Sequence, residues 1–113
     1  MLDIRPAIRQ NVYVRVISRK LLAEFWGCHR DAEVPLKLWY KTAEKATWSS
    51  LQDVRKTYSH ADAVKSKGSD TLTVFNIGGN KYRLIVRINY DYELVNVRSV
   101  LTHKEYDEGS WKE

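Results

Sequence analysis

A short run near the end of the sequence, THKEYD, places a histidine, a lysine, a tyrosine and carboxylates side by side. Thr102 and Glu105 have the spacing of a capping box, which predicts a very short helix that begins where a strand ends. His103 and Tyr106 are three residues apart and therefore share one face of that helix. Gly109 then suits the end of the helix. The run predicts reactive side chains held on one capped turn.

These residue types suit chemistry on a phosphate. A helix N-terminus carries unpaired N–H groups and a partial positive charge, and histidine exchanges protons near neutral pH. Lys104 adds a cation, and Tyr106 can donate a hydrogen bond or stack on a base. Such a group could cleave RNA without a metal ion: the ribose 2′-OH attacks phosphorus, a base takes its proton, an acid protonates the leaving oxygen, and cations stabilise the growing charge.

The alternative interpretation is structural. The run is then only a capped terminal turn with Tyr106 packed inward. Asp107 lies four residues after His103 and could reach its ring, but we interpret it as a solvated helix residue. His29 and His60 are interpreted as ordinary loop or helix-end residues.

The sequence shows no pattern typical of a metal or cofactor site. It has no H-x-x-x-H pair, and Cys28 is its single cysteine, which excludes a thiolate zinc site and an internal disulfide. Gly78 and Gly79 belong to a predicted hairpin and precede no helix, so they form no nucleotide-binding loop. We expect no metal ion and no cofactor.

In the strand predicted over residues 81–88, successive side chains point to opposite faces of the sheet. One set is apolar and belongs against the helices, and the other is mostly basic. Asn96 and Arg98, on the next strand, share one parity and could extend the basic row, although the register is open. The alternative is an ordinary solvated sheet face. The apolar set is Tyr82, Leu84, Val86 and Ile88; the basic row is Lys81, Arg83, Ile85 and Arg87.

The remaining patterns predict an α+β fold, with a small antiparallel β-sheet and N-terminal helices packed on one face. Residues 1–113 form one domain, and residues 1–10 read as a short leader. Helical spacing and capping residues predict two or three helices, and alternation with turn residues predicts four strands. The helices begin near Ser18, Asp31 and Ser49; the strands are 12–17, 72–77, 82–88 and 92–101; residues 59–70 form a basic loop.

Composition favours an anionic partner. The chain has 113 residues, a net charge of +5 and a pI near 9.4. Its N-terminus lacks the apolar core of a signal peptide, and no run approaches the roughly 20 apolar residues of a membrane helix. We therefore expect a cytoplasmic protein without membrane contact.

Three blocks of the sequence together resemble one family. VRVISRK, GGNKYRLIVRINY and VLTHKEYDEGSW are similar to the HigB-type toxins of type II toxin–antitoxin systems, from about Val12 to Trp111. These toxins are RelE-like, and the resemblance implies their fold, a small antiparallel sheet flanked by helices. The leader lies outside the match.

The resemblance implies an endoribonuclease (an mRNA interferase) that cuts mRNA, commonly on the translating ribosome. It also implies a cognate antitoxin, often a helix-turn-helix HigA-like protein that represses the operon, so that operator DNA is contacted only through the antitoxin. Arg83 then binds the scissile phosphate, and His103, Lys104 and Tyr106 supply further catalytic groups. The assignment of general base and general acid stays open. The candidate RNA-binding residues are Lys65, Lys67, Lys81, Arg87 and Arg98.

A second function class fits the same fold. A non-catalytic module could use the basic face to bind RNA, the ribosome or an antitoxin, and act as a co-repressor with its antitoxin. The two classes differ at Arg83 and His103, which only the enzyme requires.

Overall fold

A five-stranded sheet forms the centre of the protein. The computed structural model describes residues 15–17, 19–68 and 70–112, with the strands in the order β1-β5-β4-β3-β2. β1 runs parallel to β5, and the other neighbours are antiparallel. The strands are β1 (Arg15–Ile17), β2 (Asp62–Lys65), β3 (Thr71–Ile77), β4 (Tyr82–Asn89) and β5 (Leu94–Thr102).

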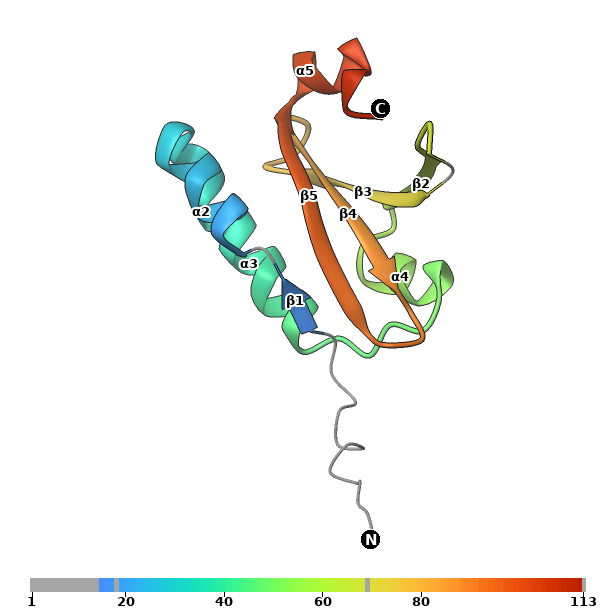
Figure 1. Cartoon of the computed structure of the whole chain (residues 1–113). Coiled ribbons are helices and arrows are strands. Elements are labelled where there is room, and N and C mark those ends of the chain that lie inside the picture. The colour runs from blue at the N-terminus through green and yellow to red at the C-terminus, as the bar shows by residue number, and fades with distance from the viewer. Residues whose placement is uncertain (1–14, 18, 69, 113) are drawn as a thin grey trace, which may run out of the picture.

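The three longer helices cover one face of this sheet (Figure 1). Leu22, Leu36 and Trp39 from the helices are buried against Phe75 and Leu84 from the strands. The predicted alternation along β4 and the predicted α+β class are therefore confirmed. The helices are α2 (Arg19–Cys28), α3 (Glu33–Glu44) and α4 (Leu51–Thr57), with a 3-10 turn η1 (Arg30–Ala32) before α3.

The opposite face carries a second, smaller apolar cluster. Leu72, Val74 and Ile85 are buried there, and Tyr106 and Trp111 pack on them. These aromatic residues come from α5 (His103–Glu108) and the 3-10 turn η2 (Ser110–Lys112), which lie at the top of β5 in Figure 1. The expectation of a basic face left open by the sheet is thus wrong at this end, because the C-terminal turns cover it.

Several predicted boundaries also need correction. The loop expected over residues 59–70 contains the edge strand β2, whose pairing with β3 is a tertiary contact. The N-cap of α4 is Ser50, which accepts from the Asp53 amide, whereas Ser49 donates to the Asp53 carboxylate. Of the strand predicted over residues 12–17, only the β1 portion lies among the described residues. Ser18 and the leader lie outside them.

A register shift separates β4 and β5 at their middle. Ile85 is paired with Ser99, but the next residue, Val86, is paired with Val97. Arg98 is therefore the extra residue of a β-bulge, a feature that changes which face a side chain reaches.

Among the helices of the described residues, none combines the length and the hydrophobicity that a membrane crossing requires.

Candidate active site

The helix α5 is fixed to the sheet by its first residues. The Thr102 hydroxyl accepts from the Glu105 amide at 3.2 Å, and the Glu105 carboxylate accepts from the Thr102 amide at 2.9 Å. The predicted capping box is therefore confirmed. The amide of His103 also donates to the carbonyl of Lys81 at 3.1 Å. This bond sets the start of α5 directly beside the start of β4.

Arg83 lies beneath α5 on the face opposite the three longer helices. It is paired with Leu101 in the sheet and is only 9% exposed. Its Nη1 donates to the carbonyls of Asn80 and Tyr82, both at 3.2 Å. Among the described residues, no carboxylate lies within ion-pair distance of this guanidinium. A buried arginine without a carboxylate partner carries charge that is available to an anionic ligand.

Tyr106 contacts Arg83 and Trp111 with its ring. The Arg83 Cζ lies 5.5 Å from the ring centroid of Tyr106, and the Trp111 ring is stacked on Tyr106 at 4.9 Å with an interplanar angle of 15°. Tyr106 is therefore packed inward on the sheet, as the structural alternative expected, and Trp111 is stacked on its ring. The three side chains form one assembly, which we name the arginine–aromatic cluster.

The same surroundings affect the Tyr106 hydroxyl. Burial raises the pKa of Tyr106 above its ordinary value, and the carboxylates of Asp62 and Asp107 raise it further, while Arg83 acts in the opposite direction. Because an unperturbed tyrosine already titrates near pH 10, this hydroxyl stays protonated at neutral pH. It is a hydrogen-bond donor rather than a base.

His103 has a carboxylate partner, which corrects the interpretation of Asp107 as a solvated residue. The His103 Nδ1 lies 3.0 Å from the Asp107 Oδ2, and both side chains are about half-exposed. A carboxylate at Nδ1 favours the proton on that nitrogen, which leaves Nε2 as an acceptor in the neutral ring. The orientation of the His103 ring is thus fixed by Asp107. Lys104, the next residue, is exposed on α5.

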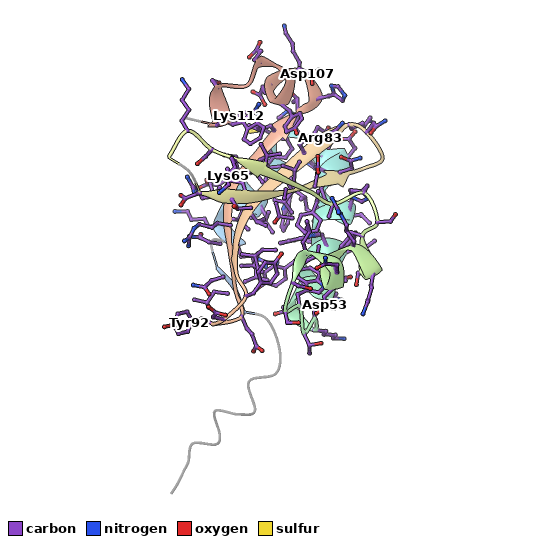
Figure 2. The ribbon with its side chains drawn as sticks, turned by 90° about the vertical axis from the view of Figure 1, so that its right-hand side faces the viewer. Asp53, Lys65, Arg83, Tyr92, Asp107 and Lys112 are labelled. Carbon is purple, nitrogen blue, oxygen red and sulfur yellow. The ribbon has the colours of Figure 1, made fainter. Side chains whose placement is uncertain are left out.

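Two of the candidate RNA-binding lysines belong to the same end of the molecule. Figure 2 shows Lys65, Arg83, Asp107 and Lys112 together at this end, with Tyr92 at the other. Lys65 is the last residue of β2. The amide of Lys67 donates to the carbonyl of Lys112 at 2.8 Å, so the loop after β2 is joined to the C-terminal turn.

The other three candidates are neutralised in part. Arg87 and Arg98 both approach the carboxylate of Asp70, at 3.8 Å each. Lys81 is ion-paired with Asp31 of η1, on the helix side of the molecule. The predicted basic row is therefore interrupted. Lys81 is directed to the helix side, and Ile85 is buried. The charges of Arg87 and Arg98 are partly neutralised by the one carboxylate of Asp70.

Asp31 has a lowered pKa because the Lys81 ammonium, and after it the Tyr82 hydroxyl, bonds to its carboxylate. A lowered folded-state pKa stabilises the fold above the ordinary aspartate pKa of ~3.9, and this contribution is lost as pH falls through the lowered value. We expect the difference in unfolding free energy between wild type and Asp31→Asn to be largest near neutral pH and to shrink below about pH 4. Urea denaturation at several pH values measures it.

A matched control for this prediction is Glu24→Gln. Glu24 pairs with Lys20 at 3.9 Å, with both side chains largely exposed, and such pairs contribute little. It should show a much smaller pH-dependent difference. A difference for Asp31→Asn that stays constant from pH 7 to pH 3 would contradict the assignment.

Trp111 is the residue of this site that the sequence reasoning missed. Its signal was an aromatic residue two positions after Gly109, the glycine that ends α5 at a φ of 81°.

Within the described ranges, no three His, Cys, Asp or Glu side chains gather as a group that could hold a metal ion.

Comparison with known proteins identifies the class to which this fold and site belong. Residues 32–109 match the HigB toxin family, described as the RelE-like toxic component of a toxin-antitoxin system. The chain therefore belongs to this family, and the resemblance seen in its sequence is confirmed.

Individual relatives agree with this assignment. The chain is 44% identical over 97 residues to the mRNA interferase toxin HigB of Escherichia coli (strain K12), which covers 83% of this chain and 88% of the relative. The mRNA interferases HigB of Escherichia coli O157:H7 and Shigella flexneri match to the same extent. As the toxic component of such a system, the chain has a cognate antitoxin as its partner.

Proposed function

We propose that this toxin is a metal-independent endoribonuclease that cleaves mRNA; its relatives are named mRNA interferases. The observation that carries the proposal is Arg83: a nearly buried guanidinium without a carboxylate partner among the described residues, in contact with Tyr106 of the short helix that also carries His103. A phosphodiester of RNA supplies the anion that this charge fits, and its 2′-OH supplies the nucleophile.

The reaction is an internal transfer of the phosphate. The 2′-oxygen forms a bond to phosphorus, and the bond to the 5′-oxygen breaks, which leaves a 2′,3′-cyclic phosphate and a 5′-hydroxyl. Arg83 stabilises the additional negative charge on the phosphate in the transition state. Its charge is held in place by the Asn80 and Tyr82 carbonyls, so little reorganisation accompanies the reaction.

His103 moves the proton in this proposal. Asp107 keeps a proton on Nδ1, and Nε2 then accepts the proton of the 2′-OH. Tyr106, which stays protonated, and Lys104 are the groups on the same short helix that can donate toward the leaving oxygen or the phosphate. Lys65, Lys67, Arg87 and Arg98 hold the RNA strand on either side.

The partners follow from this substrate. We infer that cleavage takes place on the translating ribosome, and therefore in the cytoplasm. The antitoxin is inferred to be a helix-turn-helix HigA-like protein, and the toxin reaches operator DNA only through it. Both inferences depend on the sequence resemblance and on the family assignment.

Induced expression tests the function directly. We expect the wild-type chain to arrest growth when it is expressed alone and to allow growth when the neighbouring gene, which encodes the antitoxin, is expressed with it. Primer extension on mRNA with and without ribosomes should show new 5′ ends, and the ribosome-containing reaction should show more of them. Growth arrest without new mRNA ends would favour a non-catalytic module.

A further inference from the structure

Trp111 is placed to hold the arginine–aromatic cluster together. We propose that it is a positioning residue, which keeps Tyr106 on Arg83 and joins this cluster to the basic loop that follows β2. The inference rests on the proposed function, since positioning matters only if Arg83 and Tyr106 act on RNA. Its evidence is a set of contacts that meet at one indole.

Trp111 contacts Tyr106 in two independent ways. Its ring is stacked on the tyrosine ring at 4.9 Å, and its Nε1 donates to the Tyr106 carbonyl at 2.8 Å. The stacking fixes the side chain of Tyr106, and the hydrogen bond fixes the backbone at the end of α5. A tyrosine held at both points has little freedom to leave the guanidinium of Arg83, which lies 5.5 Å from its ring.

The indole is itself anchored to the sheet. Gly109 takes a left-handed conformation, with φ at 81°, and this turns the chain so that η2 comes back toward α5. Trp111 then packs on the apolar cluster of Leu72, Val74 and Ile85. Ile85 of that cluster lies on β4, the strand that also carries Arg83. Trp111 therefore fixes the position of Tyr106 relative to the sheet.

The same turn holds the loop after β2. The carbonyl of Lys112 accepts from the amide of Lys67 at 2.8 Å, and the Lys112 ammonium lies 5.6 Å from the Trp111 ring. Lys67 in that loop and Lys65 at the end of β2 are proposed RNA-binding residues. One short turn therefore supports both the groups that bind RNA and the groups that act on its phosphate.

Two substitutions separate positioning from packing. Trp111→Leu retains an apolar side chain against the cluster but loses the ring stacking and the N–H donor. We expect its kcat for mRNA cleavage to fall about 100-fold, because small displacements of reacting groups have effects of this size. Trp111→Phe retains a stacking ring and loses only the donor, so its kcat should stay within about fivefold of wild type.

The titration of Tyr106 provides a readout that does not depend on activity. The pKa of Tyr106 is raised by burial, so an NMR titration of labelled tyrosine should show it returning toward the ordinary value in Trp111→Leu and remaining raised in Trp111→Phe. Trp26→Leu is the matched control: this half-buried indole lies near cations on the helix side, at 5.6 Å from Arg19 and 5.3 Å from Lys37. It should change neither kcat nor the titration of Tyr106.

The outcomes are distinguishable. If wild type cleaves mRNA but Trp111→Leu retains its kcat and the titration of Tyr106, the positioning role is overturned. It is also overturned if Trp111→Phe loses as much activity as Trp111→Leu, or if neither variant folds by circular dichroism, because Trp111 is then a structural residue. If wild type itself cleaves no RNA, the proposed function fails, and the shift of the Tyr106 titration in Trp111→Leu still supports the contact geometry.

Discussion

Replacing Arg83 by alanine is expected to lower kcat for mRNA cleavage by about 10²- to 10³-fold, the loss seen when one preorganised group at a developing oxyanion is removed. In cells the variant should no longer arrest growth. The rate of cleavage in single-turnover reactions measures the first effect, and growth after induced expression measures the second.

The size of this expected effect follows from the environment of the guanidinium. Arg83 is 9% exposed, so water screens its charge poorly and an anion brought next to it gains a strong interaction. Backbone carbonyls already fix its Nη1. An exposed lysine on a flexible stem, such as Lys104, cannot offer the same fixed charge, and its removal should cost less.

Loss of folding must be separated from loss of charge. Arg83→Lys keeps the charge without the planar group, and it should recover part of the activity while changing the KM for RNA. Arg19→Ala is the matched control, because Arg19 also lies over aromatic rings, 5.6 Å from Trp26 and 5.2 Å from Tyr40, but on the helix side. A fully toxic Arg83→Ala variant would rule out Arg83 as the phosphate ligand.

Much of the fold could be predicted from local patterns. The alternation along β4 assigned Leu84 and Val86 to the helix side, and both are fully buried there. The capping box at Thr102 correctly predicted that α5 begins at His103. Both features depend on residues that are close together in the chain, so they can be predicted from the local sequence.

Other features depend on contacts between distant segments. The edge strand β2 has no strong alternation and exists because it pairs with β3. The bulge opposite Ile85 and Val86 decides where Arg98 points, and no local pattern signals it. By alternation Lys81 belongs to the basic row. Its ammonium instead forms an ion pair with the carboxylate of Asp31, which lies fifty residues earlier in the chain.

The candidate site follows the same division. His103 and Tyr106 could be singled out because they share one turn of helix. Their partners could not be predicted in the same way. Trp111 reaches Tyr106 only after the chain reverses at Gly109, and the spacing of His103 and Asp107 allowed their pairing without requiring it. The reactive types were therefore visible in the sequence, whereas the residues that orient them were visible only in the structure.

His103→Gln is the second substitution for which we expect a large effect. Glutamine can still form hydrogen bonds at this position but cannot carry a proton between groups. General acid–base catalysis contributes about 10²- to 10⁴-fold, so kcat should fall within this range while the KM for RNA changes little. Since His103 is about half-exposed and lies on the first turn of α5, the substitution should leave the fold intact.

The pH dependence of the rate distinguishes proton transfer from simple phosphate binding. A histidine that acts as base must be neutral, so wild-type kcat should fall as the solution becomes acidic, and His103→Gln should lose this acidic limb. A histidine that only binds phosphate acts as a cation, and the rate would then rise toward acid.

Asp107→Asn should reduce kcat less, because it weakens the orientation of the ring at Nδ1 without removing the base. His60→Gln is the control, as His60 is exposed beside Tyr58 and has no part in the mechanism. Unchanged cleavage by His103→Gln at every pH would assign proton transfer to Tyr106, Lys104 or solvent.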